Sequence, residues 1–265
     1  MKFIFFFFPL IFANNEENCR IANPDWDYYS QVTHVFGIPI VATREVHPSA
    51  IALTCKYFEF LIKDNQEIVR NLQRRNHKVV ILGRRQELAR DVPEYHGYEK
   101  KLHSRGVGGT RHNPVTVIPE ENVLCLKEDK QPGDIILHEL AHAIHLVGTP
   151  RGLLQKIARS YRHAERYNLF LYNYAAEDPR EYFAVGVQTF LNKSPAENYA
   201  TFDQPHRRPL RITRDHLFRN DRHLYSLVEN VLLKKEGWKL PKRCELWKNG
   251  IMDPNTLVDS FDQLL

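Results

Sequence analysis

The sequence contains few cysteines, four among 265 residues, and no two of them stand in a CxxC pair. This absence argues against a cysteine-based zinc site and against a thioredoxin-like redox motif. Zinc-finger signatures and basic heptad regions are also missing, so nucleic acid is not an expected partner. The chain shows no internal repeat and no alternating βαβ units, which argues for an α+β fold.

Long apolar runs are missing everywhere except at the N-terminus. Residues 1–13 combine a short basic start, a phenylalanine-rich run and a small residue at a possible cleavage point. This pattern is typical of a secretory signal peptide. The run is shorter than the roughly 20 apolar residues that a transmembrane helix needs. We therefore expect a mature chain that begins near Asn14, is secreted to the extracellular space and has no stable membrane association.

The rest of the chain has the composition of a folded globular protein, with 43% hydrophobic residues. Its length suffices for one large domain with a substantial core. We expect a single domain over 14–245 and a C-terminal tail over 246–265, in a monomeric protein. Strands are predicted mostly before residue 130 and helices mostly after it, which predicts a small mixed sheet packed on helices.

The pattern of apolar residues, prolines and glycines predicts the individual elements. Strands are expected at 38–42, 78–82, 115–118 and 123–126. Helices are expected at 48–73, 135–147, 150–167, 178–191, 213–220 and 222–236.

The cysteines and the charge give weaker indications. An even number of cysteines in a secreted chain predicts two disulfides, and three pairings of Cys19, Cys55, Cys125 and Cys244 are possible. Asn192 begins a glycosylation sequon, although a proline follows the motif. The net charge of +5 is spread along the chain. A solvated surface is the simplest interpretation, and a patch for an acidic substrate or a polyanion is the alternative.

The strongest chemical signal is the H-E-x-x-H motif formed by His138, Glu139 and His142. Asp134 is a plausible N-cap and Gly148 a plausible C-terminal cap of the helix that carries the motif. On a helix, residues four apart lie on one face one turn apart, so both imidazoles can reach one metal ion.

Glu139 points about 100° away from His138 around the helix axis. It can therefore lie beside an open coordination position and act as a general base without being a ligand. The helix is otherwise strongly apolar, and burying these polar side chains is costly unless they are paired or bind a metal. A pair of satisfied core histidines is the alternative interpretation.

A catalytic zinc ion needs a third protein ligand. A histidine at the spacing H-E-x-x-H-x-x-G-x-x-H is excluded, because His145 and Gly148 stand where the glycine and the histidine belong. The remaining candidates are Glu165, Glu177 and Glu181. We favour Glu181, which begins a helix ahead of an apolar run, but its position three residues after an Asp N-cap also suits a capping box. Periodicity alone leaves these two roles open.

Four segments together resemble the peptidase domain of the anthrax lethal factor-like family, which includes the Pro-Pro endopeptidases. They are Gly37–Val41, Gly106–Gly109, His138–His142 and Tyr174–Ala184, in that order along the chain. The likeness covers residues 37–191, and its most specific part is the pattern Y-x(6)-E-[FY]-F-A.

The resemblance implies a zincin-like metallopeptidase with one Zn²⁺ ion per chain. His138, His142 and Glu181 would bind the metal, and Glu139 would be the general base. Tyr174 would direct its hydroxyl at the substrate carbonyl and stabilise the oxyanion.

The resemblance further implies that Gly106–Gly109 lies beside the cleft, where an edge strand pairs with an extended peptide. Two positions depart from the family pattern. Val185 and His145 stand where the family often has acidic residues. We expect His145 to support the site or belong to the core, and these departures bear on substrate choice more than on the metal.

The sequence therefore predicts a secreted zinc-dependent endopeptidase that acts on a peptide or protein substrate. A secreted toxin-like or binding protein that keeps zinc with little turnover is the alternative. A basic extracellular protein that binds polyanions, with an incidental H-E-x-x-H motif, is a third hypothesis.

Overall fold

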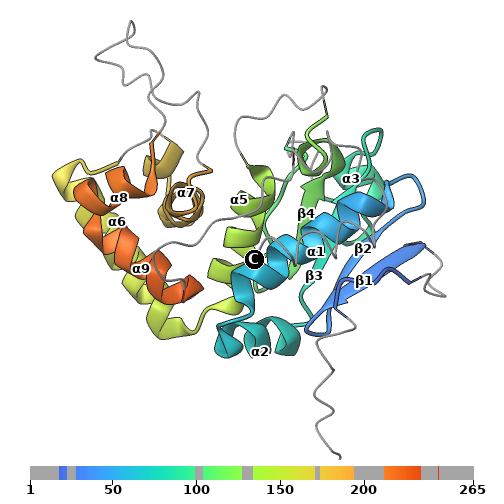
Figure 1. Ribbon diagram of the computed structural model, residues 1–265, viewed down its shortest axis with the longest axis horizontal. Coiled ribbons are helices and arrows are strands. Elements are labelled where there is room, and N and C mark those ends of the chain that lie inside the picture. Colours follow the sequence, from blue (N-terminus) through green and yellow to red (C-terminus); the bar gives the residue numbers. More distant parts are fainter. Residues whose placement is uncertain are drawn as a thin grey trace, which may run out of the picture.

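A computed structural model describes residues 18–22, 28–98, 104–126, 134–170, 174–193, 212–233 and 244. The predicted signal peptide at 1–13 and the predicted tail at 246–265 lie outside these residues. The described part has an α+β architecture built around a mixed sheet, as the sequence predicts (Figure 1).

The described elements alternate between strands and helices at first and are helical from residue 134 onward. The strands are β1 (Gln31–Val35), β2 (Ile38–Ala42), β3 (Lys78–Leu82) and β4 (Val115–Pro119). The α-helices are α1 (Pro48–Ile62), α2 (Gln66–Arg74), α3 (Leu88–Asp91), α4 (Glu120–Val123), α5 (Ile135–His142), α6 (Arg151–Tyr167), α7 (Pro179–Phe190), α8 (Arg214–Asn220) and α9 (Arg222–Leu232). Short 3-10 turns occupy η2 (Pro93–Tyr95) and η4 (Tyr174–Ala176), and a π-helical turn occupies η3 (Ala143–Gly148).

The four strands lie in the order β1-β2-β3-β4. A hairpin makes β1 antiparallel to β2, whereas β2, β3 and β4 run parallel to one another. Helices α1 and α2 form the crossover between β2 and β3, so the expectation of no βαβ unit is wrong. Parallel strands need such a crossover connection, and the long apolar helix α1 provides it.

Both faces of the sheet are buried, and side chains alternate between them as the pleat requires. Ile40, Val79 and Ile81 face the core shared with α1 and α5, which lie across one side of the sheet (Figure 1). Val41 and Val80 face a second apolar cluster that contains Tyr29, Leu88 and Tyr95. A sheet covered on both sides explains why the parallel strands are continuous apolar runs.

Two predicted elements differ from the structure. The single helix expected at 48–73 is broken after α1, because Asn65 caps a new helix by accepting the Ile68 amide at 3.3 Å. The strand expected at 123–126 is wrong. The helical turn α4 occupies part of this segment, and Asn122 accepts the Ile135 amide at 3.0 Å, at the first residue of α5.

Helix α5 lies between the sheet and the later helices, in contact with β4 on one side and α7 on the other (Figure 1). One buried apolar cluster extends from the sheet through α5 to α7 and α9. Side chains on this central helix can therefore meet residues from both ends of the described chain.

Two disulfides are formed, as expected from the cysteine count. They join Cys19 to Cys55 and Cys125 to Cys244. Of the described helices, none has the length and apolar character needed to cross a membrane.

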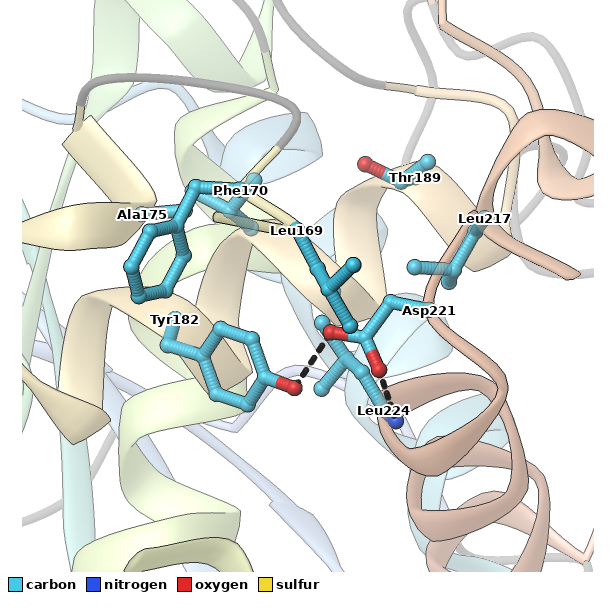
Figure 2. A pocket seen from close by; sticks show the side chains of 10 residues that line it. Leu169, Phe170, Ala175, Tyr182, Thr189, Leu217, Asp221 and Leu224 are labelled. Atoms are coloured by element: carbon cyan, nitrogen blue, oxygen red, sulfur yellow. Dashed lines mark hydrogen bonds between the residues drawn. The ribbon is translucent and has the colours of Figure 1, made fainter. Parts of the chain in front are cut away.

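A buried polar network joins α6, α7 and α9 beside a small apolar pocket. The Tyr182 hydroxyl donates to Oδ2 of Asp221 at 2.5 Å, and Asp221 Oδ1 accepts the Leu224 amide at 3.0 Å (Figure 2). Ser160 on α6 adds its hydroxyl at 3.0 Å from that of Tyr182. Since Tyr182 follows Glu181 in the chain, this network holds the start of α7 against α6 and α9.

Candidate metal centre

The helix that carries the H-E-x-x-H motif has a well-capped N-terminus. Asp134 is its N-cap and accepts the Leu137 amide at 3.4 Å. Asn122 accepts the amide of Ile135 and, at 3.4 Å, that of Ile136. These side chains satisfy amides that have no partner within the helix, which confirms the predicted start of α5.

The helical segment ends at Gly148, as predicted, but the type of its last turn differs from the expectation. Regular α-helix ends at His142, and a π-helical turn occupies Ala143–Gly148. Side chains from outside the helix donate hydrogen bonds to the carbonyls at its end. Arg111 donates to the carbonyls of residues 146 and 149, Arg75 to that of residue 147 and Asn71 to that of Gly148. Single π turns inside helices are often found at functional sites. Here the turn follows directly after the second histidine of the motif.

His138, His142 and Glu181 converge on one point and form a group that could hold a metal ion, with all their ligand atoms within 4.8 Å of one another. The two Nε2 atoms are 3.1 Å apart. Glu181 Oε2 lies 2.9 Å from Nε2 of His138, and Oε1 lies 3.4 Å from Nε2 of His142. Glu181 Oε2 is buried and makes no hydrogen bond of good geometry. Two imidazole nitrogens and a carboxylate thus face one another without a hydrogen-bonding pattern that would satisfy all of them.

The structure separates the two roles that the sequence left open for Glu181. Asp178 caps α7 and accepts the Arg180 and Glu181 amides at 2.6 and 3.2 Å. The Glu181 side chain is directed to the histidines of α5. The cap therefore fixes the backbone at the start of α7, and the carboxylate is left for the metal group.

Gln188 supports this group, although it is not among the residues predicted from the sequence. Its Oε1 lies 3.2 Å from Nδ1 of His138, and its amide nitrogen donates to the Asp134 carbonyl at 3.0 Å. When the Nδ1 proton of His138 is donated to Gln188, the neutral ring keeps its lone pair on Nε2, the atom that faces Glu181. The signal was present in the sequence, because Gln188 follows Glu181 by seven residues and so lies on the same face of α7.

Burial and mutual charge set the protonation of the group. Burial would raise the pKa of Glu181, but the His138 and His142 imidazoles hold it well below the usual range of a carboxylate. Burial lowers the pKa of His142. In His138 the opposing effect of Glu181 and Glu139 outweighs burial and raises the pKa. Burial raises the pKa of Glu139 to about 7, and the proximity of His138 offsets part of the increase.

The glycine-rich segment lies directly against the motif helix. Val107 pairs with Val117 of β4 through two backbone hydrogen bonds of 3.0 and 2.8 Å, so this segment extends the sheet edge. A Cβ on Gly106 would stand 2.6 Å from Oε1 of Glu139, and one on Gly108 would stand 2.1 Å from Cβ of His142. Both distances are far below contact. At Gly108 the obstacle is the base of the His142 side chain, so the close approach of backbone to α5 requires glycine there. At Gly106 the nearest atom is at the far end of the Glu139 side chain, which a Cβ would displace.

Tyr174 stands at the rim of the group. It opens the turn η4, its ring centroid lies 5.7 Å from that of His138, and its side chain is 39% exposed. Burial and the nearby Glu181 carboxylate raise the pKa of its hydroxyl, which therefore stays protonated at neutral pH. A hydroxyl donor thus lies beside the histidines and remains reachable from solvent.

The other predicted candidates lie elsewhere among the described residues. Glu165 on α6 and Glu177 after η4 are exposed and do not belong to the metal group. His145 is buried against the ring of Phe183, with centroids 5.1 Å apart, and is also outside the group. Val185 is buried in a small apolar cluster.

Comparison of this chain with models of protein families, with curated proteins and with solved structures finds no match.

Proposed function

We propose that this protein is a secreted zinc metallopeptidase that hydrolyses peptide bonds inside an extended substrate. The observation that carries the proposal is the convergence of His138, His142 and Glu181, with Glu139 buried on the same helix as the two histidines. Two neutral imidazoles and a carboxylate are the ligand set of one large class of catalytic zinc sites.

The distances within the group support zinc. Ligand atoms held about 2.0–2.1 Å from a tetrahedral zinc ion lie about 3.3 Å from one another. The Nε2 atoms of His138 and His142 lie 3.1 Å apart, close to that value. Glu181 offers a different carboxylate oxygen to each of them, Oε2 at 2.9 Å to His138 and Oε1 at 3.4 Å to His142. The three side chains would supply three ligands of a tetrahedral zinc ion, and the fourth position would then be open to water or substrate. When bound there, zinc would polarise a carbonyl and lower the pKa of water.

Glu139 is the residue that we assign to proton transfer. It belongs to the motif helix but lies outside the ligand group, and Gly106 packs against its carboxylate. From this position it takes a proton from the attacking water and returns it to the amine that leaves. Tyr174 donates a hydrogen bond to the carbonyl oxygen as negative charge develops on it.

The segment around Gly108 is the proposed site for the substrate backbone. Val107 directs both of its backbone groups to β4, so those of Gly106 and Gly108 point to the opposite side. The Gly106 carbonyl accepts the Ser104 hydroxyl at 2.6 Å, so we assign pairing with the substrate to the backbone groups of Gly108. An extended peptide can pair with this edge and would then run alongside α5. The resemblance to the anthrax lethal factor-like peptidases, which rests on the same glycines, motif helix and Tyr174 segment, agrees with this arrangement.

The disulfides support an oxidising compartment. Together with the apolar N-terminal run of the sequence, they favour secretion, and we expect the mature protein to act as a monomer.

The decisive test measures bound zinc and peptide cleavage in the same set of variants. Elemental analysis should find about one zinc per wild-type chain. Glu181→Gln should lose most of the metal, whereas Glu165→Gln should keep it, because Glu165 is exposed and outside the group. Cleavage of a diverse peptide library should be present in the wild type and lost in Glu139→Gln, which should still hold zinc.

The outcomes distinguish the hypotheses. Zinc without cleavage of any peptide would favour a binding protein with little turnover. A wild-type chain without zinc would overturn the proposal. Equal loss of zinc in the Glu181 and Glu165 variants would show that the third ligand is assigned wrongly.

A further inference from the structure

A basic groove lies between α6 and α9, on the helical side of the molecule where these two helices run side by side (Figure 1). Its volume is about 650 Å³. Five of its lining residues are basic, namely Lys156, Arg159, His163, Arg222 and His223, and the others are polar or aliphatic. Among the described residues that line it, none is acidic. We call this feature the α6–α9 groove.

The positions on α6 place its basic side chains along one face. Lys156, Arg159 and His163 follow at intervals of three and four residues, which is the spacing of one helix face. Seven residues of helix correspond to about 10 Å. Positive charge is therefore spread along the groove and not concentrated at one point, which suits a ligand with several anionic groups.

Within the described ranges, the nearby acidic residues do not neutralise this face. Glu165 lies about 180° around α6 from Lys156. Glu229 on α9 is directed to Arg214, with Oε1 3.7 Å from Nη2. Asp221 is buried and is occupied by the Leu224 amide and the Tyr182 hydroxyl.

The cations of the groove are accessible and have no acidic partners among the described residues. Lys156, Arg159, Arg222 and His223 are exposed, and within the described part of the chain none of them forms an ion pair. The imidazoles of His163 and His223 face each other across the two helices, with ring centroids 4.3 Å apart. The positive charges of Lys156, Arg159 and Arg222 repel one another when no counter-charge lies between them, and a bound polyanion would relieve that repulsion.

We propose that the α6–α9 groove is a binding site for a sulfated polysaccharide, separate from the metal centre. The disulfides indicate an oxidising environment, where sulfated glycans are the available polyanions. Single-stranded nucleic acids are bound by stacking bases on aromatic side chains, and no aromatic residue other than the two histidines is among the described residues that line the groove. A single free phosphate would engage only a fraction of a charged surface about 10 Å long.

The test compares two triple variants that remove the same charge. The groove variant carries Lys156→Gln, Arg159→Gln and Arg222→Gln. The control carries Arg44→Gln, Arg70→Gln and Arg85→Gln, all exposed and outside this groove. Binding of a heparin-derived dodecasaccharide is measured by titration calorimetry at several salt concentrations, with the same oligosaccharide after desulfation and a single-stranded oligonucleotide as comparison ligands.

We expect the groove variant to bind the sulfated oligosaccharide at least about 10-fold more weakly, with the slope of log affinity against log salt reduced by about 3, since three charge contacts are lost. The control variant should bind like the wild type, and desulfation should abolish binding. Zinc content should be unchanged in both variants, which separates this site from the metal centre. Equal weakening in both variants would overturn the proposal, and so would equal binding of the desulfated chain or tighter binding of the oligonucleotide.

Discussion

Replacement of Gly108 by alanine tests the packing of the glycine-rich segment on the motif helix. The new Cβ would stand 2.1 Å from Cβ of His142, whereas carbon atoms pack at about 3.5–4.0 Å. The two atoms must therefore separate by about 1.5 Å. His142 belongs to a helix capped at both ends, so the glycine-rich segment has to move, and its pairing through Val107 with Val117 is strained or lost.

The size of the effect follows from these contacts. Overpacking costs about 1–3 kcal/mol, and each of the two lost backbone hydrogen bonds adds about 1 kcal/mol. We expect the free energy of unfolding of the metal-free protein to fall by about 3–5 kcal/mol, as measured with urea in the presence of a chelator. Displacement of His142 should also weaken zinc binding by about 10- to 100-fold in competition with a chromogenic chelator.

Two further glycine variants sharpen this experiment. In Gly106→Ala the new Cβ meets the end of the Glu139 side chain at 2.6 Å, and a carboxylate can rotate away. This variant should keep zinc and lose cleavage. Gly152→Ala on α6 is the control, because a Cβ there meets nothing within 4 Å. If Gly108→Ala were as stable as Gly152→Ala and bound zinc equally well, the close approach to His142 would be refuted.

Two other predictions follow from single buried side chains. Gln188→Ala should weaken zinc binding by about 10- to 100-fold, because His138 loses the group that orients its Nδ1, whereas Gln155→Ala on the exposed side of α6 should not. Burial lowers the pKa of His77 to about 3, below the value of about 6.5 in an unfolded chain. As the pH falls, His77 therefore takes up a proton in the unfolded state before it does so in the folded state. Between about pH 6.5 and pH 3 this difference lowers the free energy of unfolding by about 1.4 kcal/mol per pH unit.

Measurements of the free energy of unfolding at several pH values check the prediction for His77. Between pH 7 and pH 5 the wild type should lose about 2 kcal/mol more than His77→Phe, whatever the stability of the variant at pH 7. The exposed His112 gives the control, since His112→Phe should retain the wild-type slope. An unchanged slope in His77→Phe would mean that His77 takes up its proton in the folded state. For Gln188, zinc affinity equal to the wild type would show that His138 needs no partner at Nδ1.

Much of the fold follows from local patterns in the sequence. The apolar runs at 38–42, 78–82 and 115–118 predict β2, β3 and most of β4, because buried strands have to be apolar on both sides. Prolines, Asp caps and glycines mark the starts of α5, α6 and α7 correctly. These signals are local, since each depends on the conformational preference of a few adjacent residues.

The missed features depend mainly on distant partners. The Asn65 side chain caps α2 locally by accepting the Ile68 amide, and it is held in place by donating to the Val231 carbonyl of α9 at 2.9 Å. The strand predicted at 123–126 fails for a similar reason, because Asn122 is engaged by the start of α5. The parallel pairing of β2 with β3 depends on how α1 packs on the sheet, which periodicity does not reveal.

The candidate site also combines a local sequence signal with contacts between residues that are distant in the sequence. The sequence alone determined the H-E-x-x-H motif, because the spacing of His138, Glu139 and His142 on a helix is a property of 3.6 residues per turn. It left Glu181 with two roles and offered Glu165 and Glu177 as rivals. Only the tertiary structure decided among them, because the packing of α7 on α5 brings one carboxylate to the two imidazoles and adds Gln188 behind them. Helical spacing is set by the local backbone, whereas the meeting of two helices is set by the core that both of them bury.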